Sequence, residues 1–259
     1  MRRAPYLAVL LLGALAVAGP AAYALPAKGE RWRPGVQGAR EYASNRAGTV
    51  SFAVRTRRHL YGHDSRMTMS SASVVKAMLM VTYLNRKGVR DRKLNGADHA
   101  LLAPMVTRSG NVAASRVRDI VGNGALEHLA GRVGMRDFAT AAIWGATQIT
   151  AADQTKLFLE IERYVVRRHR DTALRLLSSI VPRQRWGVAR VIPRGWAFYF
   201  KGGWTSAVQH QVGLLRRGDR RIAIAVLTTG SPSASYGRET ERGVALRLLR
   251  DLGHGSIPR

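Results

Sequence analysis

The stretch from Ser73 to Leu84 reads SVVKAMLMVTYL, and its only charged residue is Lys76. Apolar residues would lie on every side of this segment, which predicts a helix that is buried all round. Residues three apart share a helix face, so we expect the Ser73 hydroxyl and the Lys76 amine within hydrogen-bonding reach. Burial lowers the pKa of an amine, and a neutral amine can act as general base for a serine. The stretch therefore predicts a nucleophile with its base, at a helix N-terminus whose N–H groups can face an oxyanion.

Lysine usage favours this interpretation. Of the 42 basic residues only 6 are Lys, so the chain meets its ordinary surface needs with Arg. Arg stays protonated in proteins and Lys need not, so a Lys inside an apolar helix indicates an amine that changes protonation state. With 15 Ser in the chain, S-x-x-K also arises by chance. The alternative for this segment alone is a capping Ser73 and a snorkelling Lys76.

The N-terminus is typical of an export signal. Arg2 and Arg3 precede an apolar run, followed by the small-x-small site at residues 22–24. We expect residues 1–24 to be a signal peptide, cleaved after Ala24, and the protein to be secreted or extracytoplasmic. The alternative is an uncleaved membrane anchor, although the run is short for a transmembrane helix. The chain has no Cys, which excludes disulfides and thiolate metal sites.

The net charge of +26 indicates anionic partners. Outside the membrane these are anionic wall polymers, lipid head groups of a membrane surface, or acidic substrates. Nucleic acid is not expected as a partner. The densest basic segment, Arg163–Arg170 (RYVVRRHR), matches no recognised nucleic-acid motif and is more typical of a solvated helix face. We expect a monomer.

Strand patterns at both ends of the chain enclose a helical middle. Strands are predicted at 49–56, 59–61, 197–201, 207–216 and 221–228, and helices at 38–45, 73–84, 150–168 and 239–252. Strands from distant segments predict an α+β fold: one antiparallel sheet of about five strands, covered by N- and C-terminal helices, with a mainly helical insertion. We expect a sheet subdomain (25–62 and 197–259), a helical subdomain (63–196) and an active site at their junction.

Two further motifs follow Ser73-x-x-Lys76. Ser109-Gly110-Asn111 lies between helical segments, and Lys201-Gly202-Gly203 ends a strand. The order S-x-x-K, S-x-N, K-[TSG]-G resembles the penicillin-recognising serine enzymes, the superfamily of class A β-lactamases and D-alanyl-D-alanine peptidases. The surrounding residues from about 48 to 252 are similar to class A.

The resemblance implies a role for each residue and no cofactor. Ser73 would attack a β-lactam or a peptidoglycan-type amide and form an acyl-enzyme, with Lys76 as base. Ser109 would relay a proton, helped by Lys201, and Asn111 would hold the substrate's side-chain amide. In binding the substrate, Lys201 would attract its carboxylate, flanked by Gly202 and Gly203, and the N–H groups of Ser73 and Trp204 would form the oxyanion hole. Taken alone, Ser109 is a plain helix cap and Lys201 an ordinary strand-end lysine.

Three departures from class A limit the expected activity. The chain lacks an obvious glutamate to activate the deacylating water, since Asp137 is the only acid between Met135 and Thr150 and is more typical of a turn. Gly110 replaces an Asp, and Gly202 replaces a Thr or Ser that helps bind the carboxylate, for which Thr205 or Ser206 are possible substitutes. We therefore expect acylation with slow deacylation. The alternative is a non-catalytic wall- or β-lactam-binding protein that retains the fold.

Other residues carry weaker signals. Glu160 and Glu162 are expected to be solvated on a helix. His59 and His63 lie on a predicted hairpin, where a spacing of four does not indicate one face, so no metal site is expected. The aromatic residues Trp196, Tyr199 and Trp204 flank the third motif and either line the substrate cleft or pack in the core.

Overall fold

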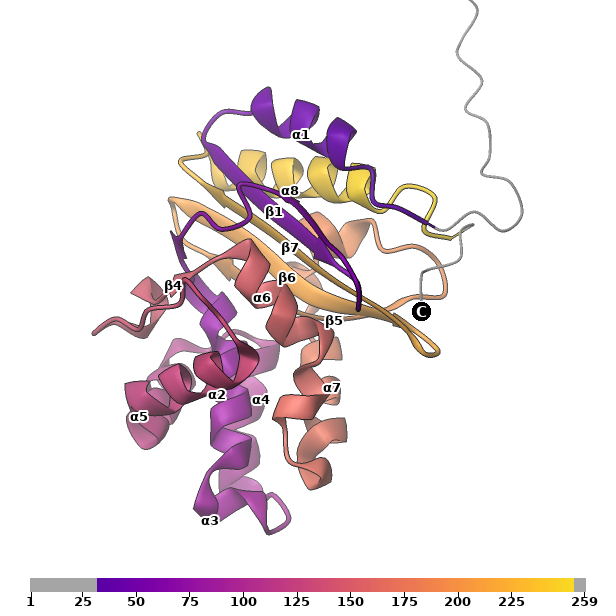
Figure 1. Cartoon of the computed structure of the whole chain (residues 1–259). Helices are drawn as coiled ribbons and strands as arrows, with labels where there is room; N and C mark the ends of the chain where they lie inside the picture. Colours follow the sequence, from indigo (N-terminus) through magenta and orange to yellow (C-terminus); the bar gives the residue numbers. More distant parts are fainter. Residues whose placement is uncertain (1–31, 254–259) are drawn as a thin grey trace, which may run out of the picture.

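A five-stranded antiparallel sheet forms the upper half of the computed structural model, which describes residues 32–253 (Figure 1). The strand order is β2-β1-β7-β6-β5, so distant segments of the sequence pair as expected and the α+β prediction is confirmed. The predicted signal peptide lies outside the described residues. The strands are β1 (Thr49–Arg55), β2 (Leu60–His63), β5 (Ala197–Trp204), β6 (Val208–Arg217) and β7 (Arg220–Thr229).

Helices cover both faces of the sheet. The terminal helices α1 (Val36–Ser44) and α8 (Ala234–Leu248) pack together above it, and α6 (Ala151–Leu159) contacts β1, β6 and β7 from below (Figure 1). Strand β7 is buried from Ile222 to Thr228. A run of apolar residues without alternation is what a strand covered on both faces requires.

The remaining helices form a second layer below α6 (Figure 1). They are α2 (Lys76–Asn85), α3 (Lys87–Arg90), α4 (Gly96–Thr107), α5 (Asn111–Val133) and α7 (Arg170–Ser178). Helix α2 is buried from Lys76 to Leu84 on every side, as its sequence predicts. Helix α5 is kinked at Gly122, where φ is +74°. Among residues 32–253 no helix is long and apolar enough to cross a membrane.

Two predicted helix boundaries were wrong. The helix expected over residues 150–168 ends at Leu159, and two 3-10 turns and α7 follow, so the basic segment is not one helix face. Glu162, which was expected to be solvated on this helix, instead lies beyond its end and pairs with Arg216 and Arg221 of the sheet. The last helix starts five residues early, because the Ser233 hydroxyl caps it by accepting a hydrogen bond from the N–H of Tyr236.

A small second sheet brings two loops to the site. Strand β3 (Met69–Ser70) pairs with β4 (Gln148–Ile149). In the same region the N–H of Ser71 donates to the carbonyl of Thr147 over 2.8 Å. The segment before Ser73 is therefore tied to the end of the loop that joins α5 to α6.

Candidate active site

Ser73 lies in a tight turn rather than at the start of a continuous helix. It belongs to a 3-10 helix, η1 (Ala72–Val75), and α2 begins only at Lys76. Ala72 and Ser109 both have left-handed backbone, with φ of +43° and +59°. Such conformations cost about 1–3 kcal/mol in residues other than Gly and gather at functional sites. Both strained residues lie at the predicted motifs: Ala72 directly precedes Ser73, and Ser109 is the first residue of S-x-N.

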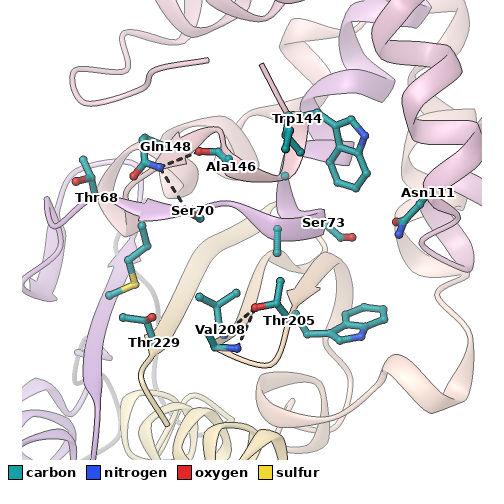
Figure 2. A pocket seen from close by; sticks show the side chains of 16 residues that line it. Thr68, Ser70, Ser73, Asn111, Trp144, Ala146, Gln148, Thr205, Val208 and Thr229 are labelled. Atoms are coloured by element: carbon teal, nitrogen blue, oxygen red, sulfur yellow. Dashed lines mark hydrogen bonds between the residues drawn. The ribbon is translucent and has the colours of Figure 1, made fainter. Parts of the chain in front are cut away.

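The Lys76 amine turns toward the second motif. Its Nζ donates to the carbonyl of Ser109 over 2.6 Å and to Asn111 Oδ1 over 2.8 Å, and lies 3.3 Å from Ser109 Oγ. The expected contact with Ser73 is not formed: within the described part of the chain the Ser73 hydroxyl makes no hydrogen bond. It faces Asn111 in the cleft instead (Figure 2).

Burial lowers the pKa of Lys76 from 10.5 to about 7. Its side chain is fully buried, and removal from water disfavours the ammonium form. Near neutral pH a large fraction of the amine is therefore unprotonated. A neutral amine donates two N–H groups and has one lone pair, which matches two acceptors and one hydroxyl around Nζ.

Ser109 Oγ lies between the two buried amines of the site. Lys201 Nζ donates to Ser109 Oγ over 3.1 Å and to the carbonyl of Gly202 over 2.9 Å. Burial, followed by the nearby charge of Lys76, lowers the pKa of Lys201 well below its usual value. With Lys76 neutral and Lys201 charged, the hydroxyl can accept from Lys201 and donate to Lys76, which is the arrangement of a proton relay.

Strand β5 approaches the nucleophile through Gly203. A Cβ on Gly203 would lie 2.7 Å from the Ser71 carbonyl oxygen and 2.9 Å from the Ser73 nitrogen, so only Gly permits this approach. β5 is an edge strand, and the N–H of Thr205 points inward to the carbonyl of Val208. Because N–H directions alternate along a strand, the N–H of Trp204 points to the open edge, beside Ser73. The two predicted oxyanion donors thus face one region.

Trp186 packs against Gly202 of the third motif. A Cβ at this position would lie 3.4 Å from Trp186 Cζ2 and 3.5 Å from the carbonyl oxygen of His210. The branched side chain of a Thr would press into the indole. Trp186 in turn meets Trp204 edge-on, with ring centroids 6.2 Å apart. Neither Trp186 nor its packing is visible in a local sequence pattern.

Thr205 and Ser206, considered as substitutes for the Thr or Ser hydroxyl that Gly202 lacks, lie in the turn between β5 and β6. Thr205 Oγ1 accepts from the N–H groups of Ala207 and Val208, so it already shapes the β5–β6 turn, and Ser206 is exposed. Of the three aromatic residues near the motif, Trp204 lines the cleft, whereas Trp196 is buried in the core. Tyr199 is half-buried under the guanidinium of Arg216.

A cleft of about 660 Å³ opens at Ser73 (Figure 2). None of the sixteen residues that line it is charged, whereas Lys76 and Lys201 are fully buried, and Lys76 donates a hydrogen bond to the lining residue Asn111. The lining residues are Thr68, Met69, Ser70, Ala72, Ser73, Asn111, Ile143, Trp144, Gly145, Ala146, Gln148, Trp204, Thr205, Ala207, Val208 and Thr229.

The loop before α6 supplies no carboxylate to this cleft. Asp137 does not line it and pairs with Arg66, with Asp137 Oδ1 2.9 Å from the guanidinium. Across residues 32–253 no three His, Cys, Asp or Glu side chains gather as metal ligands would. Sequence reasoning missed Ile143, Trp144 and Gln148, which this loop places in the cleft. A Trp in a segment otherwise rich in Ala and Thr was the one available signal.

The sheet, the helical layer and the hydroxyl of Ser109 between two buried lysines are an arrangement of the β-lactamase fold. The model of the beta-lactamase enzyme family matches residues 99–252. This is more than half of the chain, which therefore belongs to the beta-lactamase enzyme family. No curated protein matches the chain in sequence.

Solved structures share this fold at low sequence identity. The beta-lactamase from Sphaerobacter thermophilus DSM 20745 is similar with a TM-score of 0.74 and 20% identity, over 87% of this chain and 98% of that one. PBP-A is similar with a TM-score of 0.72 and 16% identity, over 89% and 99% of the two chains. The TLA-1 extended-spectrum beta-lactamase is similar with a TM-score of 0.74 and 13% identity, over 84% of this chain and 98% of that one.

Proposed function

We propose that the protein is an active-site-serine hydrolase that forms an acyl-enzyme on Ser73 with a β-lactam or a peptidoglycan-type amide. The observation that carries the proposal is Ser109 Oγ, which lies 3.3 Å from Lys76 Nζ and 3.1 Å from Lys201 Nζ beside the serine. This arrangement can move a proton from the nucleophile to a departing nitrogen. A PBP-A variant was solved as an acyl-enzyme complex with penicillin G in the same fold, which supports penicillin as the probe.

In the acylation step, Ser73 Oγ attacks the carbonyl carbon while its proton passes to the neutral Lys76 amine. Small rotations of the Ser73 and Lys76 side chains would form the hydrogen bond between them that the free protein lacks. Catalytic hydrogen bonds often tighten in this way when substrate binds. The oxyanion would be held by the N–H groups of Ser73 and Trp204. The C–N bond then breaks, and the nitrogen takes a proton through Ser109. Lys201 would attract the substrate carboxylate and keep Ser109 polarised.

Deacylation is proposed to be slow. Hydrolysis needs a base that removes a proton from water as its oxygen attacks the ester carbon. The residues lining the cleft include no Asp, Glu or His. The activity proposed is therefore nearer to a penicillin-binding enzyme with a persistent ester than to a rapid β-lactamase.

Intact-mass spectrometry after incubation with penicillin G tests acylation. We expect an adduct equal to the whole penicillin on the wild-type protein and none on Ser73→Ala. An equal adduct on Ser73→Ala, or none on the wild type, would refute the proposal. A chromogenic cephalosporin then measures turnover, and rapid steady-state hydrolysis would contradict slow deacylation.

We further propose that the protein is exported and meets anionic wall polymer through its basic surface. The support is the N-terminal sequence and the net charge of +26. In the alternative, non-catalytic function, wall binding would be the whole activity. That function predicts salt-sensitive sedimentation with purified cell wall in both wild type and Ser73→Ala, together with no adduct from penicillin G. N-terminal sequencing of the exported protein tests cleavage after Ala24.

A further inference from the structure

Trp144 covers one side of the Lys76 amine. It is the first residue of the 3-10 helix η2 (Trp144–Ala146), and the centre of its indole lies 4.7 Å from Lys76 Nζ. The other sides of the amine are occupied by Ser109 and Asn111. Lys76 is fully buried, whereas Trp144 is partly exposed on the cleft side. The indole thus separates the amine from the water in the cleft.

The indole is held in this position from two directions. Its Nε1 donates to Ser115 Oγ of α5 over 3.1 Å. The Ser71 hydroxyl lies 3.5 Å and 3.4 Å from the carbonyl oxygens of Trp144 and Gly145, and the N–H of Ser71 donates to Thr147. The turn that carries Trp144 is therefore fastened to the segment that carries Ser73, and the ring cannot swing away without breaking these contacts.

We assign hydrolysis of an ester on Ser73 to this amine. The cleft lining has no carboxylate or imidazole, and the Lys76 amine, three residues after Ser73, has its pKa lowered to about 7. A hydrolytic water would donate its proton to Nζ as its oxygen attacks the ester carbon. The C–Oγ bond would then break, with the proton returning to Ser73 Oγ. The first of these steps needs a water in contact with Nζ.

We propose that Trp144 is a positioning residue that keeps water from the Lys76 amine and so prolongs the life of the acyl-enzyme. The proposal rests on the acyl-enzyme proposed above. Acylation does not need the excluded water, because in the proposed step the proton that the amine takes comes from the Ser73 hydroxyl itself. The indole therefore separates the two halves of the reaction, permitting ester formation and opposing ester hydrolysis.

The test compares the rates of adduct formation and adduct loss. Wild type, Trp144→Ala and Trp144→Phe are acylated with penicillin G, freed of excess penicillin, and followed by intact mass. Leu246→Ala is the matched control, because Leu246 of α8 is an exposed apolar residue (56% exposed) that does not line the cleft. We expect loss of the adduct to accelerate at least about tenfold in Trp144→Ala, a small part of what a positioned base can supply. Leu246→Ala is expected to match wild type, whereas Trp144→Phe, which keeps an aromatic ring but loses the Nε1 hydrogen bond to Ser115, is expected to lose its adduct at a rate between those of wild type and Trp144→Ala.

The outcomes separate this proposal from the one on which it rests. Absence of an adduct in the wild type would overturn both. An adduct in all variants, lost at the same rate from Trp144→Ala and wild type, would overturn the role of Trp144 alone. If Trp144→Ala does not fold, Ser115→Ala serves instead, since it removes only the partner of Nε1. Its adduct is expected to be lost faster than that of wild type, and an unchanged rate would also overturn the role.

Discussion

Lys201 Nζ donates a hydrogen bond to Ser109 Oγ over 3.1 Å, deep below the cleft. The same hydroxyl lies 3.3 Å from Lys76 Nζ, so two buried amines share a single oxygen. Two positive charges that are close together and shielded from water are energetically costly. The pKa of each amine is accordingly lowered, in both cases chiefly by burial. The protonation states of the two lysines are consequently linked through Ser109.

Removing the Ser109 hydroxyl should slow acylation without unfolding the protein. We expect both Ser109→Ala and Ser109→Gly to form the penicillin G adduct roughly a hundredfold more slowly, because the proton path to the leaving nitrogen is lost. The two variants should differ in stability, since φ of +59° suits Gly and strains Ala. Urea unfolding should place Ser109→Gly above Ser109→Ala by about 1 kcal/mol. Equal stabilities would contradict the strained backbone.

The rate of acylation should depend on pH through Lys76. Its pKa of about 7 means that the neutral base becomes the main form as the pH rises past 7. Acylation at low penicillin concentration should therefore rise through neutral pH. It should fall again at higher pH, once Lys201, whose pKa burial also lowers, loses the charge that attracts the substrate carboxylate. Stopped-flow measurement between pH 5 and 10 checks this.

Lys76→Arg is the control for the pH profile. Arg keeps the positive charge but stays protonated throughout this range. We expect acylation of Lys76→Arg to be very slow and to lack the rise near pH 7. A wild-type rate that is constant between pH 5 and 9 would show that Lys76 is not the base.

The packing of Gly202 against Trp186 should appear as an energetic coupling. Gly202→Thr is expected to lower the free energy of unfolding by about 1–3 kcal/mol, because its branched atoms overpack the indole. Gly202→Ala should cost less, since its Cβ would be in ordinary contact at 3.4 Å. Combining Gly202→Thr with Trp186→Ala should recover part of the loss in a double-mutant cycle. Strictly additive effects would contradict the contact.

The uncharged cleft should reject a second negative charge on the acyl side chain. α-Carboxybenzylpenicillin differs from penicillin G by one carboxylate, and the lining offers no charged partner for it. Burying an unpaired carboxylate is costly, so we expect half-maximal acylation to need at least about tenfold more of this compound, a difference of about 1.4 kcal/mol. Competition between the two at 0.15 M salt measures it. Faster acylation by α-carboxybenzylpenicillin would show that attraction by the net positive charge of the protein outweighs the cost of burying its second carboxylate.

Glu241 should make stability depend on pH. It is fully buried in α8, and neither carboxyl oxygen has a hydrogen-bond partner in the described structure. Burial raises its pKa well above 4.5, against the opposing charge of Arg238. The folded state therefore holds this proton more tightly, and its contribution to stability is lost as the pH rises above about 4.5.

Glu241→Gln removes this ionisation at nearly constant shape. We expect it to stabilise the protein by on the order of 1 kcal/mol at pH 7.5 relative to its effect at pH 4.5. Urea unfolding of both proteins at the two pH values gives the comparison. A stability difference that does not change with pH would contradict an ionisation confined to Glu241.

The sequence predicted the site to the extent that its residues fall in motifs. Ser73, Lys76, Ser109, Asn111 and Lys201 were identified from spacing and order, and the structure brings these distant positions together around one cleft. The buried helix α2 was also predicted, because a helix that is apolar on all sides is expected to be buried on all sides. Roles in catalysis remain predictions for the experiments above.

The parts that could not be predicted depend on tertiary contacts. Trp144 and Trp186 lie in irregular segments, where no periodicity tells which way an indole points. The end of α6 was missed because local helix propensity does not report tertiary contacts such as the ion pairs of Glu162 with the sheet, just beyond Leu159. The contact of Ser73 with Lys76 was expected from helical geometry, whereas the residue lies in the tighter turn of η1.

The open edge of β5 also bears on solubility. An unpaired edge strand is a template on which another chain can add, and proteins commonly protect such edges against aggregation. Here the turn around Ser73 lies against that edge at Gly203, too close for any larger residue. The turn that places Ser73 beside the N–H of Trp204 therefore also covers this end of the edge strand. A variant that pushes η1 away from β5 would expose more unpaired backbone to another chain.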